Sequence, residues 1–420
     1  MTTVPQSIAD TIVDPKAYAD GRRVDEAFAW LRREAPLAQV QPEGYDALWP
    51  VTRHADILEI ERQSSLFRNG IRPPTLTSIE GLKQSTAPEF DIRTLVQMDD
   101  PDHGAYRRLT QPWFLPQNIA RLEHRMRDIA RKTIGGMLAH GTSCDFVRDV
   151  ALLYPLRVLM EILGVPEADE ARMLKLTQEL FGASDPDMNR DRTIVSGGSS
   201  MELMRNTLIE FMIYFLQIIE DRRTSPQDDL ASAIANGEVN GAPLGPAEAM
   251  GYYVLVATAG HDTTSNTTAT GMWALAERPE LFRRLKNDPS LIQGLVEESI
   301  RWATPVKHFM RTASADAVVA GQKIARGDWL MLCYPSGNRD EAVFDDPFRF
   351  DITRTPNRHL AFGYGAHLCI GQHLARMEMR IFWQELLPLL AEVELDGTPL
   401  LSEANFVCGP KRVPLRFKAA

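Results

Sequence analysis

The sequence predicts a mainly α-helical protein with a minor β-sheet region. Apolar residues recur at helical spacing almost throughout from Pro116 to about Arg223, and a second helical run extends from Pro246 to Ala276. Strand-like segments are few and short, chiefly Ala317–Ala320 and Trp329–Tyr334. These patterns indicate a bundle of amphipathic helices.

The composition is that of a globular protein with ample material for a large core. The chain has 420 residues, of which 44% are hydrophobic and 24% charged. Length alone would suggest roughly two or three domains. The net charge of -10 argues against a nucleic-acid partner, because binding phosphate backbones requires clustered Lys and Arg.

The cysteines and the apolar runs indicate in which cellular compartment the protein is found. The four cysteines are widely spaced without a C-x-x-C pair, which argues for a reducing environment rather than a disulfide framework. The N-terminal stretch lacks the basic-then-apolar pattern of a signal peptide. The most apolar runs, Leu208–Ile219 and Tyr252–Ala259, are shorter than the ~20 residues that a membrane span needs. We therefore expect a cytoplasmic protein that does not enter a membrane.

The N-terminal part of the chain is predicted to hold short elements and one long loop. Val24–Arg33 and His54–Glu61 have helical spacing, and Tyr45–Thr52 has the pattern of a short strand pair. Arg68–Asp91 is rich in Gly, Pro, Ser and Thr and has little periodicity. Because loops of this length in a compact domain are usually functional or disordered, we expect a lid or pocket wall, with disorder as the alternative.

A further helix is predicted to begin after Pro101, where acidic and helix-forming residues follow. His103 and Arg107 lie four positions apart, so they share one face of this helix. Such a pair could bind a carboxylate in a shielded site, or it could belong to a solvated polar face.

The helical run Pro246–Ala276 contains residues that favour helices poorly. Gly260, Asp262 and Thr263 stand in its middle, in the string A-G-H-D-T-T that begins at Ala259. The Thr263 hydroxyl can bond back to the carbonyl four residues earlier and open the helix locally. The resulting notch would have room for dioxygen and water; a seam of small residues between packed helices is the alternative. The orientation of the histidine in this string is left open.

Leu291–Trp302 is predicted to be a helix with Glu298 and Arg301 on one face. Exposed pairs of this kind contribute little to stability. Here Val296 and Ile300 surround the pair with apolar bulk, which indicates that it is partly buried.

The stretch Phe362–Gly371, F-G-Y-G-A-H-L-C-I-G, places glycines on both sides of Cys369. Glycine lets the backbone pass close to a flat, bulky group. A helical pattern follows Cys369, so N–H groups at a helix N-terminus are expected to favour its thiolate, which suits an axial ligand of haem iron. A buried, inert cysteine is the alternative. A zinc site with His367 and His373 lacks a fourth ligand at a usual spacing.

The string F-x-x-G-x-H-x-C-x-G resembles the haem-thiolate monooxygenases, the cytochrome P450 family. The strings H-x-x-x-R, A-G-x-D-T-T and E-x-x-R precede it in that family's order and spacing, so the resemblance covers essentially the whole chain. It implies that residues 1–420 form a single haem-thiolate monooxygenase domain without a fused reductase. It also implies the family's fold, with haem b between the long central helix and the helix after Cys369.

The resemblance further implies a role for each motif. Cys369 would bind the iron through its thiolate, and Asp262 and Thr263 would deliver protons to iron-bound oxygen. The residues implied to bind the haem, several of them through its propionates, are His103, Arg107, Ala259, Gly260, Arg311, Phe362, Gly363, His367 and Gly371.

A structural role is implied for Glu298 and Arg301. In the family this pair is completed by an arginine from a P-x-x-F-x-x-x-R string, which Pro347, Phe350 and Arg354 match here. The resulting charge network would fix the loop that leads to the ligand cysteine.

Within the family, stretches such as RMLKLTQELFG and YYVLVATAGHDTTS look most like the bacterial terpineol hydroxylase subfamily. This implies a small apolar substrate, a monoterpene or an alkyl-aromatic hydrocarbon. The residues that the resemblance places around the substrate, each equally suited to an ordinary core, are Leu255, Thr258, Ala259, Val306, Phe309 and Phe406.

The implied reaction hydroxylates a C–H bond with O2 and two electrons. Lacking a reductase domain, the chain is expected to take these electrons from a [2Fe-2S] ferredoxin with its NAD(P)H-dependent reductase. A peroxide-driven peroxygenase is one alternative, although peroxygenase members tend to replace the acid–alcohol pair formed here by Asp262 and Thr263. A non-catalytic haem sensor is another, although an inert protein would not need a proton relay.

Overall fold

A computed structural model of the chain describes residues 3–84, 93–181, 185–188 and 198–420 and is mainly helical. The longer helices are α3 (Arg22–Glu34), α6 (Asp102–Thr110), α8 (Glu123–Ala139), α9 (Leu153–Leu163), α10 (Glu170–Phe181), α11 (Gly198–Thr224), α13 (Pro246–Ala259), α14 (Asp262–Ala276), α15 (Pro279–Asn287), α16 (Ile292–Ala303) and α18 (Gln372–Leu386). The shorter ones are α1 (Gln6–Thr11), α2 (Pro15–Asp20), α4 (His54–Glu61), α5 (Ile79–Gln84), α7 (Pro116–Ile119), α12 (Leu230–Ala235) and α17 (Tyr334–Gly337).

The strands form one larger sheet and several small ones. The four-stranded sheet has the order β1-β9-β6-β2, with β1 (Trp49–Val51), β9 (Trp329–Cys333), β6 (His308–Ala313) and β2 (Phe67–Arg68). In it, β1 runs parallel to β9, and β6 is antiparallel to both β9 and β2. A second, antiparallel sheet joins β10 (Leu390–Leu395), β13 (Pro414–Ala419) and β3 (Ser143–Asp145). The two-stranded pairs are β4 (Glu238–Val239) with β5 (Ala242–Pro243), β7 (Ala317–Val319) with β8 (Gln322–Ile324), and β11 (Leu400–Leu401) with β12 (Pro410–Arg412).

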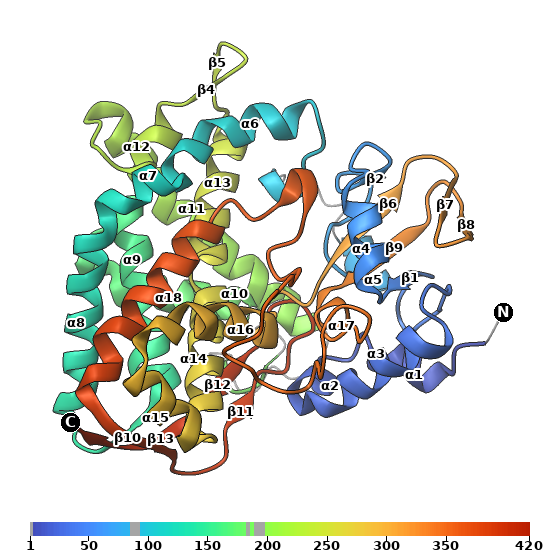
Figure 1. Cartoon of the computed structure of the whole chain (residues 1–420). Coiled ribbons are helices and arrows are strands. Elements are labelled where there is room, and N and C mark those ends of the chain that lie inside the picture. The colour runs from blue at the N-terminus through green and yellow to red at the C-terminus, as the bar shows by residue number, and fades with distance from the viewer. Residues whose placement is uncertain (1–2, 85–92, 182–184, 189–197) are drawn as a thin grey trace.

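The four-stranded sheet and most of the long helices lie on different sides of the molecule. Figure 1 shows α8, α9, α14 and α18 on one side of the molecule, and the four-stranded sheet with α1 to α4 on the other. The chain that precedes α18 runs between the two sides. Among the described residues, no helix is both long and apolar enough to cross a membrane.

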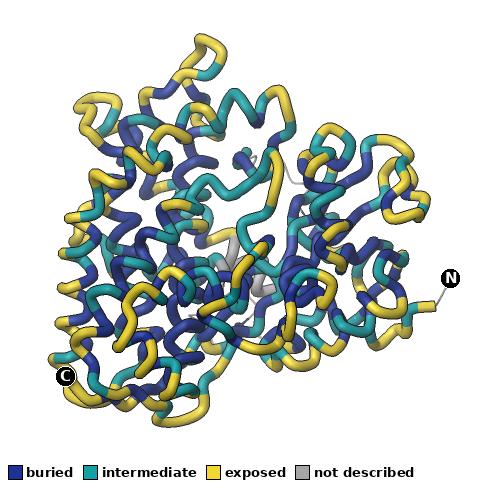
Figure 2. Tube along the Cα trace, in the orientation of Figure 1, coloured by how far each residue is buried: buried dark blue, intermediate teal, exposed yellow. Residues whose placement is uncertain are grey.

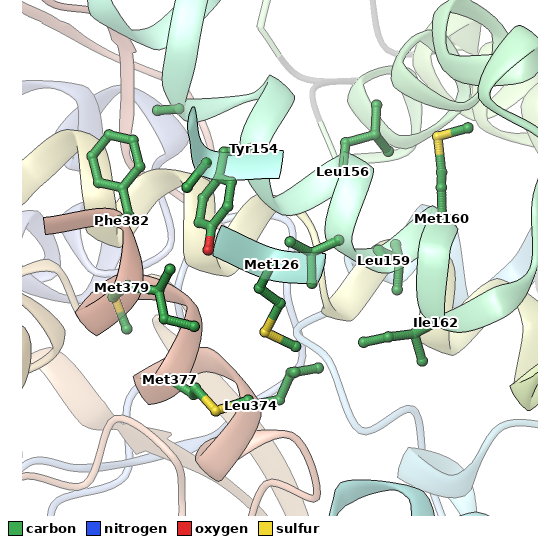
Figure 3. Packing of buried hydrophobic residues seen from close by; sticks show 14 of the residues in the cluster. Met126, Tyr154, Leu156, Leu159, Met160, Ile162, Leu374, Met377, Met379 and Phe382 are labelled. Carbon is green, nitrogen blue, oxygen red and sulfur yellow. The ribbon is translucent and has the colours of Figure 1, made fainter. Parts of the chain in front are cut away.

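The main core lies among the helices. Buried apolar side chains of α8, α9, α14 and α18 form one cluster, part of which Figure 3 shows, and Figure 2 shows buried residues on the inner sides of the helices and exposed ones outside. Tyr154 of α9 and Phe382 of α18 pack with ring centroids 5.4 Å apart. The Tyr154 hydroxyl donates to the Glu378 carbonyl at 3.1 Å, so this buried polar group is satisfied. The cluster thereby anchors α18, the helix that follows Cys369.

Most predicted elements are confirmed. The helices expected at Val24–Arg33, His54–Glu61 and Leu291–Trp302 are α3, α4 and α16, with small differences at their ends. The predicted loop Arg68–Asp91 contains the short helix α5, and its residues 85–91 lie outside the described part of the chain.

Two predictions about strands are wrong. Tyr45–Thr52 is not a strand pair: its strand β1 pairs with the distant β9, and Leu48 forms an isolated bridge with Val40. The region from Pro116 to Arg223, where no strand was expected, contains β3, which pairs with the C-terminal β13. Both errors have the same cause, since a short strand is stabilised by a partner that the local pattern does not reveal.

Candidate active site

Cys369 lies in a glycine-rich loop just before α18. Its backbone N–H donates to the carbonyl of Phe362 at 2.9 Å, which closes the loop. Gly363 and Gly365 have φ angles of 68° and 71°, a region that favours glycine. A Cβ at Gly365 would also strike the carbonyl oxygen of Glu61. The glycines therefore allow this loop to pack directly on the end of α4.

The sulfur of Cys369 accepts hydrogen bonds from the backbone N–H groups of Gly371 and Gln372 at the start of α18. Burial raises the pKa of the Cys369 thiol, and the hydrogen bonds and the charges of Arg107 and Arg376 lower it without outweighing burial. The N–H groups at the start of α18 therefore act on the pKa in the predicted direction, but burial has the larger effect on the free thiol. A coordinating thiol is deprotonated outright by a metal cation, and the same N–H groups would then stabilise the thiolate.

His103 and Arg107 of α6 both face the loop that carries Cys369. The ring of His103 is buried and lies 4.1 Å from that of His367, centroid to centroid. Arg107 Nη2 donates to the Leu368 carbonyl at 2.7 Å. Burial lowers the pKa of His103, and the charge of Arg107 lowers it further. The shared helix face expected from their spacing is thus the face that covers the loop.

Arg311 reaches the same loop from β6. Its Nη2 lies 3.4 Å from Oε1 of Glu61, and the Tyr334 hydroxyl donates to that oxygen at 2.8 Å. Burial raises the pKa of Glu61 to about 7, although Arg311 and Tyr334 oppose the shift. The other oxygen, Oε2, is buried without a hydrogen-bond partner. Sequence reasoning missed Glu61 and Tyr334, because only folding brings α4 and α17 to Arg311.

This cluster of donors suits the propionates of a haem. Burial lowers the pKa of His367 to about 2, and the charges of Arg311, His103 and Arg107 contribute, so these side chains are near one another. Two arginines and two histidines thus gather beside the Cys369 loop, and the Glu61 carboxyl lies against one of them, Arg311. A pair of further carboxylates would satisfy such a donor set, so the residues fit the group.

The predicted helix Pro246–Ala276 is divided into α13 and α14. Gly260 caps α13, and a Cβ there would press on Leu159 of α9 at 3.2 Å. The Thr263 hydroxyl donates to the Ala259 carbonyl at 2.8 Å, as its position in the string predicts. The local opening is therefore confirmed, whereas the expectation of one continuous helix is wrong.

His261 stands at this break and is held by two neighbouring segments. Its Nε2 lies 2.8 Å from the Leu152 carbonyl oxygen, and its Nδ1 lies 3.0 Å from Thr177 Oγ1 on α10. The same Nδ1 is 3.6 Å from Oδ1 of Asp262. Burial raises the pKa of Asp262, and His261 opposes the shift. Since Oδ2 of Asp262 is buried without a partner, this carboxyl is suited to holding a proton.

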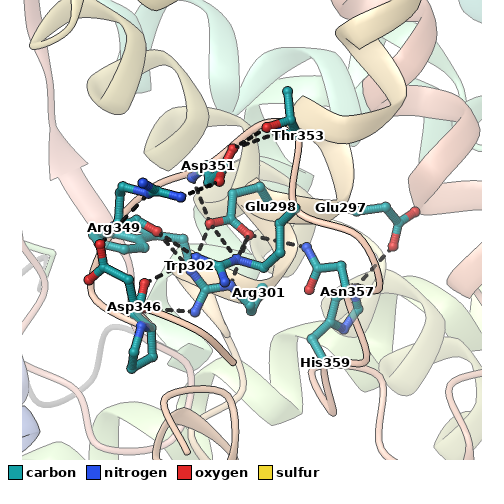
Figure 4. A network of polar contacts seen from close by, with 12 residues as sticks. Glu297, Glu298, Arg301, Trp302, Asp346, Arg349, Asp351, Thr353, Asn357 and His359 are labelled. Carbon is teal, nitrogen blue, oxygen red and sulfur yellow. Dashed lines mark hydrogen bonds and ion pairs between the residues drawn. The ribbon is translucent and has the colours of Figure 1, made fainter. Parts of the chain in front are cut away.

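Glu298 and Arg301 of α16 form a fully buried ion pair. Arg301 Nη2 and Nε lie 2.7 and 2.8 Å from the two carboxylate oxygens of Glu298. Arg354 Nε lies 3.3 Å from Oε2 of Glu298, and Asn357 Nδ2 donates to the same oxygen at 3.1 Å. Figure 4 shows Glu298 and Arg301 at the centre of this network. The predicted members are brought together, and Asn357 is an addition that no spacing indicated.

Helix α16 also forms ion pairs with the segments on both sides of the cysteine loop. Glu297 of α16 lies 3.1 Å from Nε2 of His359 and 2.7 Å from Nε of Arg376 on α18. Burial alone would raise the pKa of Glu297, but the hydrogen bonds from His359 and Arg376 outweigh it and lower the pKa to about 2. The position of Cys369 therefore depends on α16 from two directions.

The predicted substrate-wall residues form two groups. Phe309 and Phe406 pack edge to face with ring centroids 5.6 Å apart, and Val306, near Phe309 in the chain, forms a β-bridge with Val407, the residue after Phe406. The other predicted wall residues, Leu255, Thr258 and Ala259, lie together in the last turns of α13.

Comparisons with known proteins cover the chain from end to end. The family model described as Cytochrome P450 matches residues 83–415. The chain is 47% identical to "Cytochrome P450-terp" of Pseudomonas sp, over 100% of this chain and 99% of that protein. It is 33% identical to a linalool 8-monooxygenase of Pseudomonas putida, over 92% of this chain and 94% of that protein.

Solved structures agree with these relatives. The structure of CYP108D1 from Novosphingobium aromaticivorans matches with a TM-score of 0.92 and 42% identity, over 100% of both chains. Mycobacterium marinum CYP268A2 in complex with pseudoionone matches with a TM-score of 0.88 and 32% identity, over 99% of this chain and 100% of that one.

Proposed function

The chain belongs to the cytochrome P450 family of monooxygenases, and we propose that it hydroxylates a compact apolar substrate, a monoterpene or an alkyl-aromatic hydrocarbon. The full-length similarity to "Cytochrome P450-terp" carries the proposal. Similarity to a linalool 8-monooxygenase and to a protein solved with pseudoionone supports it. The edge-to-face pair of Phe309 and Phe406 would offer such a substrate an apolar wall.

We propose that residues 1–420 act as one domain that would bind haem b, with the Cys369 thiolate as the ligand of its iron. When bound, this group supplies the activation of O2, in which two electrons and two protons convert O2 and a C–H bond into an alcohol and water. The two N–H groups that bond the Cys369 sulfur support its assignment. The proposed propionate ligands are His103, Arg107, Arg311 and His367. The residues proposed to lie against the ring are Ala259, Gly260, Phe362, Gly363 and Gly371.

Asp262 and Thr263 are proposed to deliver the protons. The Thr263 hydroxyl donates to the Ala259 carbonyl, so its oxygen lone pairs remain available to a water molecule in the opened helix. The raised pKa of Asp262 lets it hold a proton at a pH where an exposed aspartate has lost it. A carboxyl that exchanges protons with solvent, followed by a hydroxyl that passes them on, forms a relay.

Glu298, Arg301 and Arg354 are proposed to keep the Cys369 loop in place. The network is buried, and its hydrogen bonds join α16 to the chain before the loop. An uncompensated buried charge is costly, so each member depends on the others.

The electrons are proposed to come from a [2Fe-2S] ferredoxin with its NAD(P)H-dependent reductase, in the cytoplasm. Membership of a family whose bacterial members use redox partners and O2 supports this proposal. All the cysteines of the chain, Cys144, Cys333, Cys369 and Cys408, are free thiols, which suits a reducing compartment.

The ligand assignment is tested by the absorption spectrum of the reduced, carbon-monoxide-bound protein. We expect the red-shifted Soret band of thiolate ligation in the wild type and its loss in Cys369→Ser. Colourless protein, or an unshifted band in the wild type, would overturn the assignment.

The reaction is tested by turnover. We expect hydroxylated product with ferredoxin, reductase and NADH, and little with hydrogen peroxide alone. Efficient turnover with peroxide alone would instead support the peroxygenase alternative, and binding without turnover under either condition would support the sensor.

The substrate class is tested by titration with monoterpenes and alkylbenzenes. We expect binding to convert the haem from low spin to high spin, which the absorption spectrum records. If none of these compounds changes the spin state, the substrate class is wrong while the ligand assignment still stands.

A further inference from the structure

His308, the first residue of β6, is fully buried and lies between two loops that come from opposite ends of the chain. Its Nδ1 is 2.9 Å from the carbonyl oxygen of Asn405. Its Nε2 is 3.0 Å from the backbone nitrogen of Leu76. One imidazole ring thus joins three segments that are distant in sequence.

The two partners determine where the proton of the ring resides. A carbonyl oxygen only accepts, so Nδ1 of His308 must carry the proton and donate it to Asn405. The N–H of Leu76 only donates, so Nε2 must be unprotonated and accept. The ring is therefore neutral and held in one tautomer. Burial lowers the pKa of His308 to about 4 although the bond to Asn405 opposes the shift, so the ring stays neutral near pH 7.

The first loop joined by His308 leads directly to α5; we call residues 74–78 the Leu76 segment. The Pro74 carbonyl accepts from the backbone N–H of Met310 at 2.8 Å, so the segment runs along β6. Leu76 packs against the cluster that contains Met310 and Cys333. This segment belongs to the region predicted from sequence to form a lid or pocket wall.

The second loop, residues 403–409, carries Phe406; we call it the Phe406 loop. Its backbone bonds to the residues just before β6, with the Lys307 N–H donating to the Phe406 carbonyl at 2.8 Å and the Cys408 N–H donating to the Pro305 carbonyl at 3.0 Å. The Phe406 ring lies 5.4 Å from the His308 ring and 5.6 Å from that of Phe309, centroid to centroid.

We propose that His308 is a positioning residue for substrate binding, whose neutral ring joins β6 to the Leu76 segment through Nε2 and to the Phe406 loop through Nδ1. It thereby sets how closely the Leu76 segment and the Phe406 loop approach each other around Phe309. The inference rests on the proposed function in one respect, since it takes Phe309 and Phe406 as part of the substrate wall. Within the part of the chain that the structure describes, His308 has no hydrogen bond or ring contact with the cysteine loop or the proton relay.

Two variants distinguish the effect of the His308 hydrogen bonds from the effect of its side-chain volume. His308→Gln keeps one donor and one acceptor, because the amide nitrogen can donate to Asn405 and the amide oxygen can accept from Leu76. His308→Leu fills similar space but leaves both backbone groups buried and unsatisfied. We expect the dissociation constant for substrate, from the spin-state titration, to rise roughly tenfold in His308→Leu and to stay within about threefold of wild type in His308→Gln.

The same variants are compared by product distribution and by hydrogen exchange in the substrate-free holoenzyme. His308→Leu should give a broader mixture of hydroxylation positions and faster amide exchange in the Leu76 segment and the Phe406 loop. Its carbon-monoxide difference spectrum should match the wild type. Wild-type affinity, products and exchange in His308→Leu would overturn the proposal, as would a His308→Gln variant that behaves like His308→Leu.

A measurement on the unaltered protein covers the case in which His308→Leu fails to fold. In the diamagnetic ferrous carbon-monoxide form, nitrogen-15 NMR of the imidazole should show His308 with a proton on Nδ1 and none on Nε2. A proton on Nε2 near pH 7 would overturn the proposal. The hydrogen-exchange and tautomer results do not depend on the substrate, so they still decide this inference if no terpene or alkylbenzene binds.

Discussion

Nδ1 of His261, in the break between α13 and α14, lies 3.6 Å from Oδ1 of Asp262, the first residue of α14. Both side chains are buried. His261 also contacts Thr177 of α10 and the carbonyl of Leu152, just before α9. The histidine therefore fixes the position of the proposed proton donor relative to two neighbouring helices. The sequence around His261 does not indicate this role.

Replacing His261 by Gln is expected to raise the pKa of Asp262, because His261 opposes the effect of burial on that carboxyl. The Gln amide nitrogen can still donate to the Leu152 carbonyl, and the Thr177 hydroxyl keeps its own bond to the Leu174 carbonyl, so the packing is largely preserved. In the pH profile of product formation, the inflection due to Asp262 should move to higher pH. Asp262→Asn, which has no carboxyl to titrate, should lose that inflection. An unchanged profile in His261→Gln would show that the histidine does not act on Asp262.

Thr263→Ala should lower product formation tenfold or more while NADH consumption continues, because the hydroxyl that passes the proton is gone. The unused reducing equivalents should be recovered as hydrogen peroxide. Thr267→Ala is the matched control, since the Thr267 hydroxyl makes the same kind of bond, to the Thr263 carbonyl at 2.8 Å. Equal losses in the two variants would point to helix geometry rather than proton delivery.

Relationships within one helix were predictable from the sequence. His103 and Arg107 share the face that covers the cysteine loop, and Glu298 and Arg301 meet in the core. Both follow from the 3.6-residue period of the helix, which places positions three and four apart on one side. The apolar neighbours of Glu298 also indicated burial, because a helix that packs on a core brings that whole face inside.

Relationships between distant segments were not predictable. Glu61, Tyr334 and Asn357 have no neighbours in sequence that mark them, and they join the site only because α4, α17 and the chain before the loop fold onto it. The break after α13 was indicated by Gly260, but the role of His261 depends on partners from α10 and from Leu152. These features depend on tertiary packing, which the local sequence pattern around each residue does not reveal.

Glu298→Gln should lower the free energy of unfolding by about 3–5 kcal/mol, because Arg301 is left buried without its charge partner. Urea unfolding followed at the Soret band would measure both stability and haem retention. Glu26→Gln is the control, since it removes an exposed partner of Arg22 at 2.8 Å and should have little effect. Comparable losses in the two variants would contradict the view that burial gives the Glu298 network its importance.

The lowered pKa of Glu297, about 2 against the usual 4.5, makes its contribution to stability depend on pH. Above pH 4.5 the carboxyl is charged in both the folded and the unfolded protein, and its contribution to the free energy of unfolding is complete. That contribution is lost as the pH falls toward 2. Because one pKa unit corresponds to about 1.4 kcal/mol, Glu297→Gln should be less stable than wild type by about 3 kcal/mol at pH 7. Urea unfolding at pH 7, 6 and 3.5 should show the same difference at the first two values and a smaller one at the third. A difference that does not change with pH would mean that Glu297 contributes by packing rather than by its charge.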